Sequence, residues 1–274
     1  MQPVTIGIAG WALPRADAEL FPPASFGSNL ARYAAVFDAV EINSSFYRPH
    51  RPETYERWAD SVPAGFRFAV KLPRSVTHEK RLQDVEAELD RFAAEAGALG
   101  EKLGWILVQT PPSLRFDPAA VAALFAGLAE RFGARRPAGG KRRNGPGPGA
   151  QSQRQVCVAC EARHGSWFGD EATALLREME VIRVIADPPA GEPGPFIATA
   201  GQAAYVRLHG SPLIYRSIYE SERLAQVAAW LRKQHGEALV IFDNTMSGTQ
   251  VRQAAQLRQM LTSSSSDRHP GSHT

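Results

Sequence analysis

The chain has 274 residues, of which 44% are hydrophobic and 22% are charged, and its formal net charge is +3. This length allows one large core or two modest ones, and two cysteines exclude a disulfide scaffold. No apolar run approaches the roughly 18 residues of a membrane span, and the amino terminus lacks a basic stretch followed by an apolar region. We therefore expect a cytoplasmic protein with no membrane partner.

One basic segment accounts for the positive net charge. Residues 133–155 are rich in Gly, Pro and Arg and contain no acidic residue; their basic residues are Arg135, Arg136, Lys141, Arg142, Arg143 and Arg154. Removing these six charges from +3 leaves −3 for the rest of the chain, so the overall charge is no argument for nucleic-acid binding. The segment has almost no apolar side chains to bury. We predict a disordered basic insertion here, for which contact with nucleic acid stays open, and a disordered tail over residues 262–274.

Eight short runs with strand character alternate with helical patterns along the chain. The predicted strands are Val4–Trp11, Ala39–Phe46, Phe66–Leu72, Trp105–Thr110, Val156–Arg163, Ile182–Asp187, Ala204–His209 and Ala238–Asn244. The predicted helices are Asn29–Phe37, Pro52–Ser61, Val85–Leu99, Pro118–Phe132, Asp170–Glu180, Glu220–His235 and Thr249–Leu261. Such alternation is typical of an α/β fold with a parallel sheet.

Eight strands in roughly 240 residues, once the insertion and tail are removed, are the usual content of a barrel. We therefore predict a TIM-like (β/α)8 barrel that forms a single domain over residues 1–261. A doubly wound open sheet is the alternative. That fold normally carries a glycine-rich phosphate-binding turn, of which Gly7-Ile8-Ala9-Gly10 is only a fragment.

The predicted strands end on polar residues, and the active site of such a barrel lies at the carboxyl ends of its strands. Because residues two apart share a face of a strand, three polar pairs point the same way: Glu41 with Asn43, Glu161 with Arg163, and Arg207 with His209. Their apolar neighbours Ile42 and Leu208 would face the helices, which places the pairs in the lumen. Lys71 points inward by the same rule. For the last strand, alternation leaves open whether Asp243 or Asn244 points inward.

Charges inside a barrel destabilise it unless they are paired. The polar strand ends therefore indicate either a functional pocket or a structural network of ion pairs. A ring of charges from six or seven strands favours the pocket, because polar and titratable groups gather at functional sites.

Seven motifs along the chain resemble, in the same order, those of the YecE-like family, domain of unknown function 72. They are Gly7-Ile8-Ala9-Gly10-Trp11, Ala39–Tyr47, Phe66–Arg74 with Thr77-His78 following, Gln109–Ser113, Glu161–Phe168, Tyr205–Gly210 and Phe242–Thr245. The resemblance spans about residues 5 to 261, and Gly165 departs from it where the family has a proline. It implies a TIM-like barrel, but no reaction, because the family carries no established biochemical activity.

Fifteen residues at the strand ends are candidates for the site. The candidate catalytic residues are Glu161, His209 and Glu41, whose side chains suit general acid–base work. The candidate substrate-binding residues are Lys71, Arg163, His164, Arg207, Asn43, Tyr47, Gln109, Trp11, Trp167, Asp187, Asp243 and Asn244. The cationic members would hold an anion, and the aromatic members would stack on a base or a sugar.

Several of these residues are also of the types that bind hard metal ions: Glu41, Glu161, Asp187, His209 and Asp243. However, Lys71, Arg163 and Arg207 lie among them and would oppose a divalent cation. We predict no metal site and assign no cofactor. Cys157 and Cys160 have the spacing of a redox pair, but within a strand their thiols face opposite sides.

These observations predict an enzyme that acts on a small phosphorylated or carboxylated substrate by acid–base chemistry. Hydrolysis, lyase chemistry and isomerisation all stay open, because a barrel fold does not imply a reaction. Two alternatives also stay open. One is a metal-dependent barrel that processes nucleic acid, and the other is a ligand-binding protein without catalysis.

Overall fold

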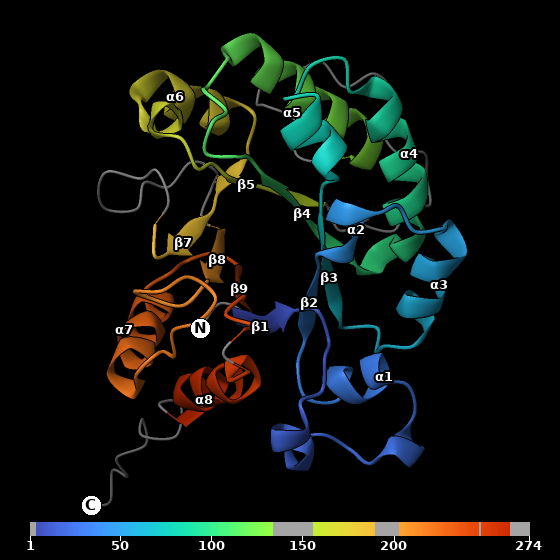
Figure 1. Cartoon of the computed structure of the whole chain (residues 1–274), viewed down its shortest axis with the longest axis vertical. Coiled ribbons are helices and arrows are strands. Elements are labelled where there is room, and N and C mark those ends of the chain that lie inside the picture. The colour runs from blue at the N-terminus through green and yellow to red at the C-terminus, as the bar shows by residue number, and fades with distance from the viewer. Residues whose placement is uncertain (1–3, 134–155, 190–202, 247, 264–274) are drawn as a thin grey trace, which may run out of the picture.

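The computed structural model describes residues 4–133, 156–189, 203–246 and 248–263. Within these ranges, parallel strands form one sheet with helices around it (Figure 1): β1 (Val4–Ala9), β2 (Ala39–Ile42), β3 (Arg67–Lys71), β4 (Leu103–Gln109), β5 (Cys157–Glu161), β6 (Ile182–Arg183), β7 (Ile185–Asp187), β8 (Ala204–Leu208) and β9 (Ala238–Phe242). Their order in the sheet is β6-β5-β4-β3-β2-β1-β9-β8-β7. Strands adjacent in this order are therefore also consecutive in the chain, except that the first strand, β1, pairs with the last, β9.

The segment from Ile182 to Asp187 joins the two ends of the sheet. Its first half pairs with β5, where Ile182 is the register partner of Ala159. Its second half pairs with β8, where Ile185 is the partner of Val206. The barrel therefore closes through this one segment, which confirms the predicted TIM-like fold. The prediction of a single unbroken strand over this segment is wrong, because the segment changes its pairing partner midway.

The helices follow the strands in the order expected for a barrel: α1 (Asn29–Ala34), α2 (Ser44–Tyr47), α3 (Pro52–Asp60), α4 (Glu86–Ala96), α5 (Pro118–Phe132), α6 (Asp170–Glu178), α7 (Ser221–Arg232) and α8 (Gln250–Ser263). The helix predicted over 118–132 is confirmed. It begins after Asp117, whose Oδ1 accepts hydrogen bonds from the backbone N–H groups of Ala119 at 3.0 Å and Ala120 at 3.3 Å. This is the capping that the sequence indicates.

The second predicted strand is shorter than expected. The chain leaves the sheet after Ile42 and forms the short helix α2, which the sequence pattern did not predict. The Ser45 hydroxyl donates to the backbone oxygens of Ile42 at 3.0 Å and Lys71 at 2.7 Å. This side chain occupies acceptors at the ends of β2 and β3, and so holds the turn against both strands.

Alternation along the strands separates the apolar side chains into two layers. The outer layer, between strands and helices, contains residues such as Val40, Phe68 and Val206. The inner layer fills the lumen with Ala39, Ala69, Trp105, Leu107, Ala159, Ile182, Val184, Tyr205, Leu239 and Ile241. The rings of Trp105 and Tyr205 meet edge to face, with their centroids 5.3 Å apart. This plug closes the lumen on the side of the strand amino termini.

The predicted basic insertion lies outside the described residues, apart from Gly133, which follows α5. The description resumes at Val156, just before β5. The described residues on either side of the segment, Gly133 and Val156, thus lie at the end of a helix and just before the amino end of a strand. Residues 264–274 also lie outside the description, and α8 continues past the predicted boundary at residue 261. The predicted disorder of both segments stays a prediction.

Candidate functional site

The polar side chains at the carboxyl ends of the strands converge in the lumen. We call the following residues the mouth cluster: Glu41, Lys71, Gln109, Glu161, Arg163, Arg207, His209 and Asp243. Hydrogen bonds or ion pairs connect all of them. Their strand neighbours Ile42, Cys160 and Leu208 lie in the outer apolar layer. Alternation therefore identified the inward face correctly.

Arg207 is the centre of the mouth cluster and is fully buried. Its Nε and Nη2 donate to the two oxygens of Glu41 at 3.0 and 2.7 Å. Nη2 also donates to Asp243 Oδ2 at 2.8 Å, while Nη1 donates to Glu161 Oε2 and, at 3.4 Å, to Gln109 Oε1. These contacts engage all five N–H groups of the guanidinium. Arg207 holds three carboxylates together and has no donor left for a substrate, which contradicts its predicted role in binding one.

Glu41 is equally enclosed. Besides its two contacts with Arg207, it accepts a hydrogen bond from the Tyr205 hydroxyl at 2.7 Å, and its side chain has no exposure. Among the described residues, His209 lies within ion-pair distance of Glu161 and Asp243 and not of Glu41. The expectation that Glu41 is catalytic is therefore not supported, and its contacts indicate that it orients Arg207.

The ion pairs of the mouth cluster determine its charge state. Burial favours the neutral form of Glu161, but Arg207, His209 and Arg163 hold its pKa well below the usual range. Asp243 also has a lowered pKa, since Arg207 and His209 outweigh the effect of burial. Burial likewise opposes the charge of Arg207, whose pKa the carboxylates keep well above its ordinary value. All three groups are therefore charged at neutral pH.

Arg163 carries the network outward from Glu161. Its Nε and Nη2 donate to Glu161 Oε1 at 2.9 and 2.7 Å, and 21% of its side chain is exposed. Burial lowers the pKa of Arg163, but Glu161 and the Tyr215 hydroxyl more than reverse this and raise it. Arg163 is thus a fixed cation that has one side on the network and one side towards solvent.

His209 lies between two carboxylates and is 2% exposed. Its Nδ1 is 3.0 Å from Asp243 Oδ2, and its Nε2 is 3.4 Å from Glu161 Oε1. Nε2 is buried and has no hydrogen-bond partner within the described ranges. Burial lowers the pKa of His209, but Asp243 and Glu161 raise it above its ordinary value. The Tyr215 ring packs edge to face on the imidazole, with centroids 5.8 Å apart.

Lys71 is the buried amine of the cluster. Its Nζ donates to Gln109 Oε1 at 2.8 Å and lies 4.3 Å from the centre of the Phe46 ring. Burial and the nearby Arg207 lower its pKa to about 8, and the carboxylates of the cluster only partly oppose this. Lys71 is therefore much closer to losing its proton at neutral pH than an exposed lysine is.

Three predicted site residues lie outside the mouth cluster. Trp167 is fully buried in the outer apolar layer, where its Nε1 donates to Leu114 O at 2.9 Å. Asp187 pairs with Arg223 of α7 at 3.0 Å, because its register partner on β8 is the outward-facing Leu208. The side-chain amide of Asn244 donates to Gln253 Oε1 of α8 at 2.6 Å. These placements contradict the grouping of the three residues with the others, and they show that Asp243 is the inward residue of its strand.

The remaining predicted residues lie around the strand ends. His164 begins the short helix Gly165–Phe168, and its Nδ1 accepts from the backbone N–H of Ser166 at 3.1 Å. Trp11 packs edge to face on Trp58 of α3, 5.0 Å between centroids. Tyr47 is 72% exposed, and its ring packs edge to face on Phe46 with centroids 5.0 Å apart. Asn43 follows β2, and its Oδ1 is buried without a partner in the described part of the chain.

Two residues near the cluster were not among the sequence candidates. His78 packs edge to face on Phe46 at 4.9 Å. Burial, Lys71, Arg74 and Arg163 lower its pKa, which shows that several cations surround it. The Thr77-His78 motif was the available signal, but no strand period applies to it because it lies in a helical turn after β3. Tyr215 belongs to the loop after β8, where a sequence pattern does not define orientation.

The described residues contain no group of three or more His, Cys, Asp or Glu side chains arranged to hold a metal ion. The carboxylates of the mouth cluster are instead directed at Arg207. Cys157 lies with the inner layer and Cys160 with the outer layer, as strand alternation predicted. None of the described helices is long and apolar enough to cross a membrane.

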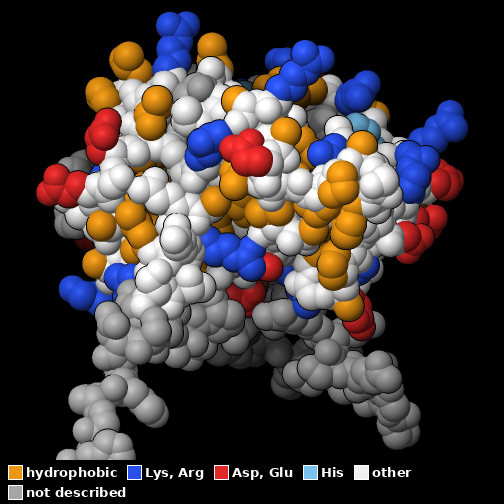
Figure 2. Space-filling view, turned by 90° about the horizontal axis from the view of Figure 1, so that it is seen from below, with side chains coloured by type: hydrophobic (Ala, Val, Ile, Leu, Met, Phe, Trp, Pro, Cys, Tyr) orange, Lys and Arg blue, Asp and Glu red, His pale blue; other side chains and the backbone are white. Residues whose placement is uncertain are grey.

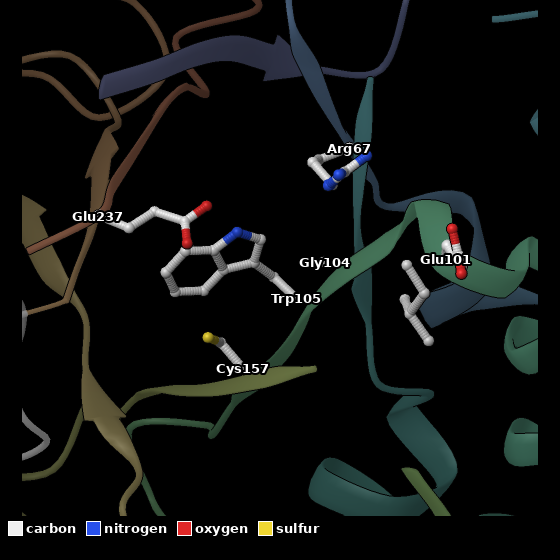
Figure 3. Close-up of a pocket in the computed structure, with 7 residues that line it drawn as sticks. Arg67, Glu101, Gly104, Trp105, Cys157 and Glu237 are labelled. Carbon is white, nitrogen blue, oxygen red and sulfur yellow. The ribbon is translucent and has the colours of Figure 1, made fainter. Parts of the chain in front are cut away.

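A small cavity lies at the other end of the barrel, near the strand amino termini (Figure 3). It measures about 10 Å³, and its lining consists of Arg67, Glu101, Leu103, Gly104, Trp105, Cys157 and Glu237. That is room for about one water molecule. The plug of Trp105 separates this end from the mouth cluster, so the cavity does not belong to the candidate site.

Comparison with known sequences identifies relatives of this chain. The UPF0759 protein YecE of Escherichia coli strain K12 is 29% identical over 98 residues, which is 36% of this chain and 35% of that protein. The UPF0759 protein YunF of Bacillus subtilis strain 168 is 28% identical over 116 residues, 40% of each chain. The matched part thus spans only about a third to two fifths of these curated relatives.

Solved structures share the fold over nearly the whole chain. A DUF72 family protein from Enterococcus faecalis V583 has a TM-score of 0.72 at 19% identity and covers 94% of this chain and 95% of its own. A DUF72 family protein from Thermotoga maritima MSB8 has a TM-score of 0.69 at 24% identity and covers 94% and 98%. The sequence profile of this family, described as proteins of unknown function, matches residues 5–273. The chain therefore belongs to the DUF72 family.

Proposed function

We propose that the protein is an enzyme that acts on a small anionic substrate at the mouth of the barrel by acid–base chemistry. The observation that carries this proposal is the state of His209. Asp243 holds Nδ1, while the buried Nε2 has no hydrogen-bond partner among the described residues. An imidazole oriented through one nitrogen and without a hydrogen bond at the other is the usual arrangement of a general acid or base.

Glu161 is the proposed partner of His209 in proton transfer. The 3.4 Å between Glu161 Oε1 and His209 Nε2 is long for a hydrogen bond. A substrate hydroxyl placed against both atoms would shorten both contacts and could exchange a proton with either group. Because the pKa of Glu161 is lowered and that of His209 is raised, His209 would act as the acid and Glu161 as the acceptor.

Arg163 and Lys71 are the proposed binding groups for the anionic part of the substrate. The side chain of Arg163 is partly exposed. Lys71 makes a hydrogen bond to the neutral side chain of Gln109, so that no carboxylate neutralises it through this contact. Arg163 and Lys71 both lower the pKa of His78, together with Arg74, so three cations lie near this imidazole, although Arg74 is paired with Glu79 at 3.0 Å. Such a concentration of cations attracts a phosphate or carboxylate. Arg207 would keep the carboxylates in place, and so would act without touching the substrate.

The two alternatives to this function have weaker support. Nucleic-acid processing would draw on the basic segment, most of which lies outside the described residues. On the face drawn in Figure 2, Lys and Arg side chains are interspersed with Asp and Glu and do not form one continuous basic surface. A ligand-binding protein without catalysis would use the same groups, and it differs from the proposed enzyme only in the absence of turnover.

The test is to incubate the purified protein with a small-molecule cell extract and to follow all ions by mass spectrometry. We expect an ion that carries phosphate or carboxylate to be consumed, and His209→Asn to slow this at least about 100-fold. Arg223→Gln is the matched control, because it removes an arginine from the pair with Asp187 outside the cluster. Retention of an ion without consumption would favour the ligand-binding alternative, and consumption that persists in His209→Asn would refute the proposed role.

A further inference from the structure

Lys71 is a buried cation that the ion network leaves without a carboxylate of its own. Its side chain is nearly sealed, with 8% of the residue exposed. Among the described residues, no carboxylate oxygen lies within the 4.0 Å ion-pair distance of Nζ, because Glu41, Glu161 and Asp243 are all engaged by Arg207. Its one hydrogen bond goes to the neutral oxygen of Gln109.

On balance, the surroundings of Nζ favour the neutral amine, although the Phe46 ring and the carboxylates of the cluster favour the charged form. Burial and Arg207 oppose the ammonium charge. A pKa of about 8 gives roughly 200- to 300-fold more neutral amine at pH 7 than an exposed lysine has. A desolvated lysine beside another cation is one of the ways in which proteins activate an amine as a nucleophile towards carbonyl groups.

We infer that Lys71 forms an imine with its substrate, which is an aldehyde or ketone that also carries a phosphate or carboxylate. The anionic part of this inference rests on the proposed function above, while the imine rests on the contacts of Lys71. In the reaction, the Nζ lone pair attacks the carbonyl carbon and forms a C–N bond. Two protons are transferred from the nitrogen to the oxygen, and the C–O bond breaks. One water molecule is released, and the product contains a C=N bond.

Two contacts of Nζ and two other members of the mouth cluster provide what this sequence needs. Gln109 is a neutral acceptor that orients Nζ without stabilising its charge as a carboxylate would. His209 Nε2 is buried without a hydrogen bond within the described ranges, 3.4 Å from Glu161 Oε1, and it could protonate the departing oxygen. Arg163 would hold the anion of the substrate, and the imine would replace the role of Lys71 as a cation for that anion, because the attacking amine is neutral. The Phe46 ring covers Nζ and would limit the access of water to the imine.

Reductive trapping tests the inference on the protein as it exists. The protein is incubated at pH 7 with cyanoborohydride and either pyruvate or dihydroxyacetone phosphate, so that the two arms separate carboxylate from phosphate. Peptide mass mapping then locates the reduced adduct. We expect Lys71 to carry it at least about tenfold more often than Lys80, Lys102 or Lys233, since its amine is far more often neutral. Lys71→Arg should remove the adduct and keep the positive charge.

The result on the wild-type protein decides the inference even if the variant fails to fold. An adduct spread evenly over the lysines, or absent from Lys71 with both carbonyl compounds, would overturn it. The proposed function is tested separately by the consumption experiment with His209→Asn. Consumption that depends on His209 without trapping at Lys71 would reject the imine alone, and trapping without any His209-dependent consumption would reject the acid–base function alone.

Discussion

Replacing Arg207 with methionine removes the cation that compensates three carboxylates in the lumen. Glu41, Glu161 and Asp243 are each within hydrogen-bond distance of its guanidinium, and none of them is more than 7% exposed. Breaking a buried pair by removing one partner destabilises a protein by about 3–5 kcal/mol. At roughly 2–4 °C per kcal/mol for a chain of this size, the melting temperature should fall by about 6–20 °C.

The same substitution should reverse the pH dependence of stability. In the wild type, Glu161 and Asp243 have lowered pKa values. The stability that they contribute to the folded protein is therefore complete above their unfolded-state pKa and is lost as the pH falls through their native pKa. Without Arg207, burial dominates and raises the pKa of the carboxylates that are left behind. The Arg207→Met protein should therefore gain more stability than the wild type between pH 7 and pH 5, where the wild type gains only the contribution of His209.

Urea unfolding followed by circular dichroism at pH 7 and pH 5 measures both effects. Arg223→Met is the matched control, because Arg223 pairs with Asp187 but is half exposed. An exposed ion pair contributes only about 0–1 kcal/mol. If Arg207→Met unfolds at the same urea concentration as Arg223→Met, or shows the same pH dependence as the wild type, the description of the mouth cluster as a compensated ion network is refuted.

Three further changes test other parts of the cluster. Tyr205→Phe removes the hydroxyl that donates to Glu41 at 2.7 Å, and should destabilise the protein by about 1–3 kcal/mol in urea unfolding; an unchanged midpoint would mean that this bond is absent. Nitrogen NMR should show His209 titrating above its ordinary pKa, and Asp243→Asn should lower that pKa, since Asp243 raises it. Because the native pKa of His209 is raised, its contribution to stability is complete below the unfolded-state pKa and disappears as the pH rises through the native pKa. A titration midpoint below 6.5 would contradict the contacts of His209 with Asp243 and Glu161. The rate of acylation of Lys71 should increase with pH through a midpoint near 8, because burial and Arg207 lower its pKa. The groups that face Nζ and oppose this shift are Glu41, Glu161 and Asp243, and His78 is the other titratable neighbour. A midpoint near that of exposed lysines would mean that the carboxylates outweigh burial and Arg207.

Much of the fold was predictable from local patterns. Strand character, helical spacing and the Asp117 cap all depend on residues close together in the chain, so the sequence indicates the elements and their order without tertiary information. The period of two along a strand also identified the inward faces of β2, β3, β5 and β8. Alternation is a property of the extended backbone. It therefore predicted the inward direction of Lys71 and Arg207, which lie on the unbroken strands β3 and β8.

The role of each inward residue depended on partners far away in the chain. Glu41 and Arg207 are separated by 166 positions, and their contact arises only when β2 and β8 face each other across the lumen. Sequence reasoning treated Arg207 as one of three equivalent anion-binding cations. The structure distinguishes them. All five N–H groups of Arg207 donate within the mouth cluster, whereas Arg163 donates to the cluster from Nε and Nη2, and Lys71 Nζ makes one hydrogen bond there.

Loops and strand breaks were the other features that local patterns could not determine. The segment Ile182–Asp187 pairs first with β5 and then with β8, and this exchange turned Asp187 towards Arg223 of α7. Tyr215 reaches His209 from a loop that has no repeating period. Local propensity and alternation thus specify which side chains enter the lumen. Which of them pair, and which stay available to a substrate, follows from the closure of the barrel, because a buried charge takes its partner from whichever strand lies opposite.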